Sequence, residues 1–143
     1  HTSFEVVTGV QTCALPIFHD IADGMHNFHS VVQPLVNPVN GQIIGGEVLT
    51  RWRYEDQEIS PEIFIPIIEK ENLIVETGRW VFAQTLSLFQ QVSFTCPDLF
   101  LTFNVSYHQL IHDDLVTYME LRLSKAATHK HHLIAELTES ANA

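Results

Sequence analysis

Three oxygen-bearing side chains each stand near the end of a short apolar run of the sequence. They are Glu47, Asn104 and Glu136. Each run has the length and composition of a β-strand, and helical patterns lie between the runs. Strands that alternate with helices run parallel, so these side chains could converge at one rim of a β/α barrel. Carboxylate and amide oxygens are ligands of hard divalent cations, so the pattern predicts a site for Mg²⁺ or Mn²⁺.

The alternation of side chains along a strand gives each candidate ligand its neighbours. Glu47 shares a face with Leu49 and Arg51, while Val48, Thr50 and Trp52 share the other face and suit packing under helices. The same parity groups Asn104 with Thr102 and Ser106, and Glu136 with Ile134 and Thr138.

An inward-facing Glu or Asn near a strand end is costly unless it is paired or bound to metal. Metal ligation is one way to meet this cost. The alternative is that Arg51 forms a buried salt bridge with Glu47 or Glu136, and that Asn104 satisfies backbone groups of a loop. Spacing alone leaves both interpretations open.

The elements that position these residues follow from turn and cap signals. Ser60 before Pro61 is typical of a helix start, with Ser60 as the N-cap. The connection after the first strand is short and rich in Asn, Pro and Gly, which predicts an antiparallel hairpin. The later strands alternate with helices, which favours parallel pairing. The strands are predicted at 28–35, 43–52, 99–106 and 133–138, and the helices from Ser60-Pro61 onward, at 74–91 and at 108–127.

Composition narrows the class of protein. The 143 residues, 45% of them hydrophobic, suffice for one domain or a piece of one, whereas a complete β/α barrel needs about 250 residues. A net charge of -10 with only seven Lys and Arg argues against binding of a nucleic-acid polymer. The two cysteines indicate no disulfide framework and favour a reducing compartment.

Residues 1–17 are expected to be an artefactual or non-native segment. The stretch 7–17 resembles the conceptual translation of a sequencing adapter, and the residues before it have a plausible length for adapter and index. The prediction therefore places the domain at 18–143.

Five ordered blocks of the sequence resemble the EAL domains, which are bacterial phosphodiesterases of cyclic diguanylate. They are VQPL at 32–35, GEVLTRW at 46–52, SPEIFIP at 60–66 with LIVETGRWV at 73–81, FNVS at 103–106, and ELTES at 136–140. Their order along nearly all of the chain after Phe18 makes the resemblance specific.

The resemblance implies an α/β fold, namely a modified TIM-type (β/α) barrel whose first strand is antiparallel, truncated in this chain after about the fourth strand. It also implies a cytoplasmic domain, or the cytosolic domain of an inner-membrane protein, with cyclic diguanylate as its ligand. Sensory or GGDEF modules and a homodimer are implied partners. The implied roles are metal ligands for Glu47, Asn104 and Glu136, substrate binding for Gln33 and Arg51, and stabilisation of a loop for Glu139.

The chain departs from the family pattern in two ways. Val48 replaces the usual alanine but points away from the site by parity. The family's D-D-F-G aspartate pair, its lysine and its final glutamate and glutamine are absent, and with them the second half of the two-metal site. We therefore expect an amino-terminal fragment of a phosphodiesterase that is itself inactive, with no catalytic residues beyond the metal ligands. The alternatives are a degenerate EAL module that binds cyclic diguanylate or a protein, and an unrelated α/β interaction fragment.

Overall fold

The computed structural model describes residues 15–125 and 132–138, which form one sheet and a set of helices. The strands are β1 (Phe28–Val36), β2 (Ile43–Tyr54), β3 (Gln57–Ile59), β4 (Phe100–Ser106) and β5 (Leu133–Thr138). The helices are α2 (Pro61–Lys70), α3 (Ile74–Thr95), α4 (Tyr107–His112) and α5 (Leu115–Lys125), and residues 15–22 are also helical.

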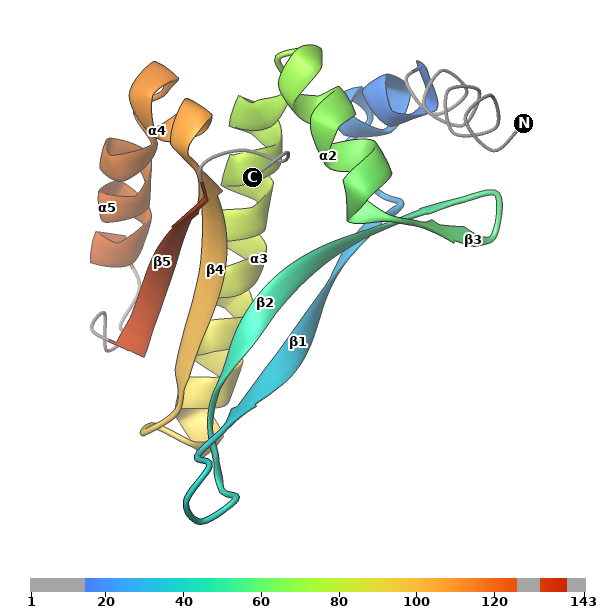
Figure 1. Cartoon of the computed structure of the whole chain (residues 1–143). Coiled ribbons are helices and arrows are strands. Elements are labelled where there is room, and N and C mark those ends of the chain that lie inside the picture. The colour runs from blue at the N-terminus through green and yellow to red at the C-terminus, as the bar shows by residue number, and fades with distance from the viewer. Residues whose placement is uncertain (1–14, 126–131, 139–143) are drawn as a thin grey trace.

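The strands are arranged as the sequence predicts. Their order is β1-β2-β4-β5, with β3 paired to β2. The β1–β2 hairpin is antiparallel, whereas β2–β4 and β4–β5 are parallel. Figure 1 shows α3 lying along the sheet behind β4, and α2 and α4 near the end of the sheet where β4 and β5 finish. The antiparallel first pair and the parallel pairs that follow confirm the predicted partial barrel.

Strand β2 pairs with β4 over only part of its length. The parallel register joins Gly45–Val48 to Phe100–Phe103, and beyond it the two strands separate. In Figure 1, β2 bends away from β4 toward β3. The separation leaves a gap in the sheet at the carboxyl end of β4.

The buried side chains form two clusters that follow the predicted strand faces. One surrounds Trp52, which stacks on Phe28 and packs against Phe64 of α2. The other joins Phe103 of β4 to Phe82 of α3. Because these residues alternate with the candidate ligands, one face of the sheet packs on helices and the other presents the ligands.

Helix α2 begins where the Ser-Pro signal predicts. The Ser60 hydroxyl accepts a hydrogen bond from the backbone N–H of Glu62, and Pro61 occupies the first helical position. The buried stripe contains Phe64, Ile67 and Ile68. This stripe holds α2 across the end of β2 and so forms one wall of the gap in the sheet.

The helix predicted at 108–127 is wrong as a single element. Asp113 has an extended backbone, with φ -139° and ψ 153°, and separates α4 from α5. Its carboxylate accepts hydrogen bonds from Arg79 at 2.9 Å and from Gln109 at 3.5 Å. The Arg79 guanidinium also lies over the ring of Tyr118 in α5, 4.9 Å from its centroid. The break between the two helices therefore coincides with a carboxylate that is bound to Arg79 of α3.

Strand β3 is absent from the sequence prediction. It is joined to β2 by a two-residue turn in which Glu55 and Asp56 both have positive φ, 50° and 64°. Such turns usually carry Asn-Gly or Asp-Gly, and the Glu-Asp pair lacks that signal.

The helix at residues 15–22 begins within the segment predicted to be non-native. Ile17 has no exposed surface and packs in the cluster around Trp52. Asp20 is buried beside them and accepts a hydrogen bond from the Trp52 indole N–H at 2.9 Å. Residues 1–14 lie outside the described residues, and the boundary after residue 17 stays a prediction.

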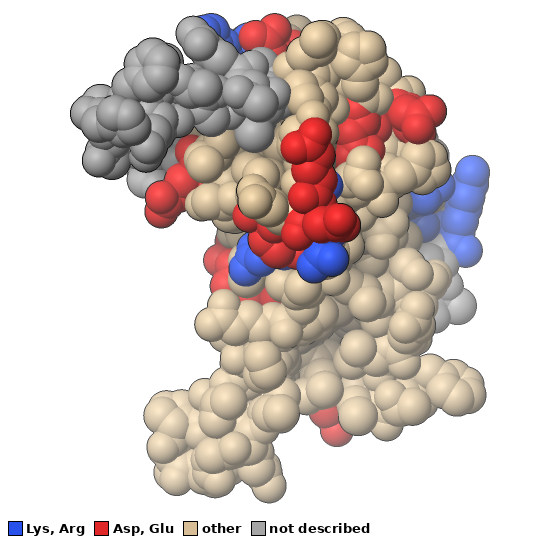
Figure 2. Space-filling view, turned by 90° about the vertical axis from the view of Figure 1, so that its right-hand side faces the viewer, with Lys and Arg blue, Asp and Glu red and all other residues tan. Residues whose placement is uncertain are grey.

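The charges are unevenly distributed over the molecule. Residues 24–46, which include most of the β1–β2 hairpin, contain no Asp, Glu, Lys or Arg. Figure 2 shows charged side chains gathered over the upper part of one face and almost none over its lower part. Within the described residues, no helix is both long and apolar enough to cross a membrane.

We predict that Gly78→Ala destabilises the protein. Alanine ordinarily stabilises a helix by about 1 kcal/mol relative to glycine. At this position, however, a Cβ would overlap the buried amide of Gln109. Overpacking of this kind costs about 1–3 kcal/mol, which outweighs the gain in propensity. Urea unfolding of Gly78→Ala, Gln109→Ala and the double variant measures the effect. Strictly additive losses would show that the two positions do not collide.

We also predict that Asp20→Ala destabilises the protein by about 1–3 kcal/mol, because a buried indole N–H would lose its acceptor. Urea unfolding followed by tryptophan fluorescence provides the measurement. Asp23→Ala is the matched control. Asp23 is exposed, and its carboxylate lies 4.0 Å from the ring of His26, which is exposed as well. Equal stability of the two variants would contradict the role given to Asp20.

Candidate functional site

The structure brings the three candidate ligands together on adjacent strands. The amide nitrogen of Asn104 donates a hydrogen bond to a carboxylate oxygen of Glu47 at 3.2 Å. On the other side, Asn104 of β4 is the register partner of Glu136 of β5. Adjacent strands lie about 4.8 Å apart, so the amide stands between the two carboxylates. This is the convergence that the sequence predicts.

The three residues lie on the face of the sheet opposite the helices. Glu47 is half-buried, and Asn104 and Glu136 are exposed. Their strand neighbours Val48 and Phe103, by contrast, are buried in the helix-covered core. A cation could therefore reach their oxygens from solvent.

The two residues predicted to bind substrate lie on the same hairpin as Glu47. Gln33 of β1 is exposed and is the register partner of Glu47. Arg51 is half-buried. It lies farther along β2 than Glu47 and on the same face of the strand. Its guanidinium donates to the backbone carbonyl of Thr50 at 3.1 Å.

Neither half of the salt-bridge alternative is seen within the described residues. Arg51 forms no ion pair there with Glu47 or Glu136. The side chain of Asn104 bonds to the Glu47 carboxylate rather than to a loop backbone group. Glu139, the predicted loop-stabilising residue, lies outside the described residues.

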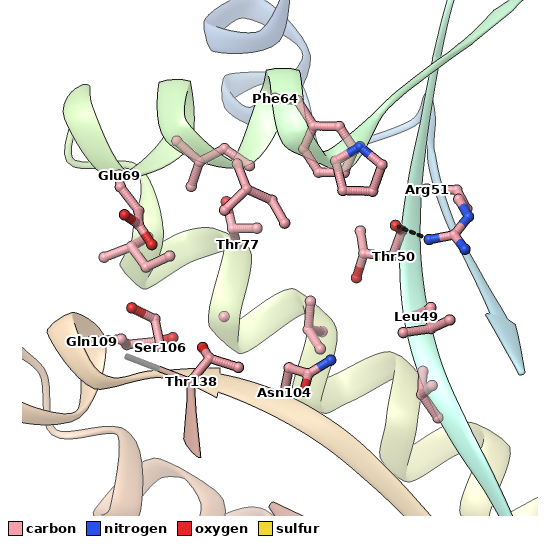
Figure 3. A pocket seen from close by; sticks show the side chains of 17 residues that line it. Leu49, Thr50, Arg51, Phe64, Glu69, Thr77, Asn104, Ser106, Gln109 and Thr138 are labelled. Carbon is pink, nitrogen blue, oxygen red and sulfur yellow. Dashed lines mark hydrogen bonds between the residues drawn. The ribbon is translucent and has the colours of Figure 1, made fainter. Parts of the chain in front are cut away.

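A pocket of about 350 Å³ occupies the gap between β2 and β4. Figure 3 shows Asn104, Ser106 and Thr138 along one side, with Leu49, Thr50 and Arg51 across from them on β2. Apolar side chains of α2 and α3 line the rest of the wall, among them Phe64, Ile65, Ile68, Ile74 and Val81. The pocket is therefore apolar at its back and polar where β4 and β5 end.

Three polar residues near the candidate ligands were not predicted to be part of the site. Gln109 lines the pocket and is almost completely buried. The hydroxyls of Thr102 and Ser106 are buried and have no hydrogen-bond partner within the described residues. Strand parity places both hydroxyls beside Asn104, but it gives no information about partners. Only the three-dimensional packing reveals that they are unpaired.

The donor set suits a hard cation. Glu47, Asn104 and Glu136 offer only oxygens, which Mg²⁺ and Mn²⁺ prefer. No group of three His, Cys, Asp or Glu side chains able to hold a metal occurs in the described part of the chain. Within the candidate set, Asn104 offers a neutral amide oxygen beside the two carboxylates.

Comparison with known proteins places this chain in a family. Residues 20–143 match the family model described as EAL domain. The chain is 32% identical over 130 residues to the bifunctional diguanylate cyclase/cyclic di-GMP phosphodiesterase MucR of Pseudomonas aeruginosa, covering 88% of this chain and 19% of MucR. It is also 32% identical over 116 residues to the cyclic di-GMP phosphodiesterase PdeL of Escherichia coli, covering 80% of this chain and 32% of PdeL.

A solved structure gives the same result. The MucR phosphodiesterase in complex with c-di-GMP matches with a TM-score of 0.76 and 31% identity, over 88% of this chain and 53% of that one. The chain thus spans about half of that solved structure and a third or less of the two curated relatives. With 124 of its residues matched and a partial TIM-type fold, the chain belongs to the EAL domain family.

Proposed function

We propose that this chain is part of a metal-dependent phosphodiesterase domain that acts on cyclic di-GMP. The observation that carries the proposal is the placement of Asn104 between Glu47, to which it is hydrogen-bonded, and its register partner Glu136. The relatives add the substrate class, because MucR and PdeL are cyclic di-GMP phosphodiesterases and the solved MucR structure contains c-di-GMP. The proposed ligands of a Mg²⁺ or Mn²⁺ ion are Glu47, Asn104 and Glu136.

The charges of these side chains bear on substrate binding. Cyclic di-GMP carries two phosphodiester groups, and two carboxylates at the rim oppose its approach. A divalent cation held by Glu47, Asn104 and Glu136 would supply positive charge for the phosphate oxygens and would activate water. Arg51 adds a guanidinium, which can bind phosphate through paired N–H groups. We assign Gln33, the exposed register partner of Glu47, to the side of the nucleotide groove.

We further propose that this chain by itself does not turn over the substrate. Glu47, Asn104 and Glu136 would provide only part of the ligands that a two-metal site needs. A two-metal mechanism needs a second set of ligands, and the described residues contain no group of three or more His, Cys, Asp or Glu side chains that could hold a metal ion. Binding without hydrolysis is the expected behaviour.

We predict that the chain binds Mn²⁺ and that Glu47→Gln weakens this binding at least tenfold, because one charged ligand becomes neutral. Titration followed by electron paramagnetic resonance of free Mn²⁺ measures it. Glu62→Gln, at an exposed position in the first turn of α2, is the matched control. Unchanged affinity in Glu47→Gln would remove Glu47 from the site.

We predict that incubation of the chain with cyclic di-GMP and either Mg²⁺ or Mn²⁺ yields no linear dinucleotide. Chromatography of the nucleotides is the measurement, and the MucR phosphodiesterase domain serves as the active reference. Metal-dependent appearance of product would refute the proposed inactivity.

The same samples distinguish a phosphodiesterase domain from a module that only binds the dinucleotide. If calorimetry detects cyclic di-GMP binding that requires Arg51 but neither metal nor Glu47, a degenerate binding role would replace the phosphodiesterase proposal. Binding that requires the cation would support the proposal as stated.

A further inference from the structure

The hydrogen bond between Asn104 and Glu47 uses the end of the amide that cannot bind a cation. The nitrogen of Asn104 donates to Glu47 at 3.2 Å, whereas a cation would need the oxygen. Turning the amide by half a rotation would present that oxygen. The same rotation would remove the hydrogen-bond donor from the Glu47 carboxylate.

A second donor lies next to Glu47. Thr102 of β4 is the register partner of Glu47 across the parallel β2–β4 pair. Both residues alternate with core residues, Leu101 and Val48, and so lie on the face away from the helices. Thr102 is only 3% exposed, so its neighbours cover it although that face of the sheet is open.

The Thr102 hydroxyl has no hydrogen-bond partner within the described residues. A buried hydroxyl without a partner is unfavourable, and such groups often mark a site of water, ion or functional change. A hydroxyl hydrogen can rotate toward whichever acceptor becomes available. A carboxylate that has lost its donor is such an acceptor.

We propose that Thr102 is a positioning residue of the cation site, whose hydroxyl takes over the Glu47 carboxylate when Asn104 turns its oxygen toward the ion. This inference rests on the proposed function, because it needs a cation at Glu47 and Asn104. Groups that hold a metal ligand in place typically change metal affinity by about 10–100-fold when they are removed. Thr102 fits such a role because it gains a partner only when the ligand is rearranged.

Among the described residues, Ser106 carries another unpaired hydroxyl on this face, but it is less well placed for the role. Its register partner is Thr138, whose own hydroxyl donates to the Val105 carbonyl at 3.2 Å. It has no carboxylate opposite it in the register, whereas Thr102 has Glu47. The geometry therefore favours Thr102.

The test compares variants of the whole chain at this one position. Thr102→Ser keeps the hydroxyl and Thr102→Ala removes it, while Thr102→Val keeps the shape of threonine without the hydroxyl. Mn²⁺ affinity is measured by electron paramagnetic resonance, and unfolding in urea is measured without metal. We expect the Ala and Val variants to bind Mn²⁺ at least about tenfold more weakly than the Ser variant. We expect Thr102→Val to unfold no earlier than the unaltered chain, since it buries no unpaired hydroxyl.

Ser93→Ala is the control, because Ser93 carries another unpaired buried hydroxyl on α3, outside the residues that line the site. Its Mn²⁺ affinity should equal that of the unaltered chain. Equal affinity in Thr102→Ser and Thr102→Ala would overturn the inference and leave the metal site standing. Failure of the unaltered chain to bind Mn²⁺ would overturn the metal-site proposal, and the role of Thr102 with it.

Discussion

The register of β4 determines where the polar and apolar side chains of the sheet lie. This strand lies between β2 and β5 and pairs in parallel with both. Its odd-numbered residues Leu101, Phe103 and Val105 are buried against the helices, and Asn104 is exposed on the opposite face. A slip of one residue would bury the amide and expose Phe103, so the hydrophobic effect on one face fixes the polar geometry on the other.

The gap beside β4 follows from the bend of β2. Pairing of β2 with β4 stops at Val48–Phe103, and β2 continues to β3 and α2 through the turn at Glu55 and Asp56. The aromatic cluster around Trp52 stabilises this departure, because Trp52 is buried against Phe28 of β1 and Phe64 of α2. The pocket therefore lies where the carboxyl end of β2 packs in the core around Trp52, while β4 and Val48 of β2 pack in the core around Phe103.

Much of this arrangement was predictable from the sequence because it depends on local alternation and on caps. The hairpin, the start of α2 at Ser60 and the convergence of Glu47, Asn104 and Glu136 all follow from such signals. The break at Asp113 did not, and its carboxylate binds Arg79, 34 residues earlier in the chain. Likewise, parity placed Thr102 beside Asn104, but the absence of a partner for its hydroxyl within the described residues depends on packing across strands. Polar contacts between residues far apart in the chain produce no periodic pattern in the sequence.

The choice of an amide between two carboxylates has a physical consequence for the site. Without a cation, three carboxylates on neighbouring strands would repel one another, whereas Asn104 can donate to Glu47 and lower that repulsion. The same amide offers an oxygen when its orientation is reversed. Under the proposed function, one neutral side chain would act as donor to Glu47 without a cation and as ligand with one. If the amide turned, the Glu47 carboxylate would lose its donor, and the buried, unpaired hydroxyl of its register partner Thr102 would be the nearest replacement that the register offers.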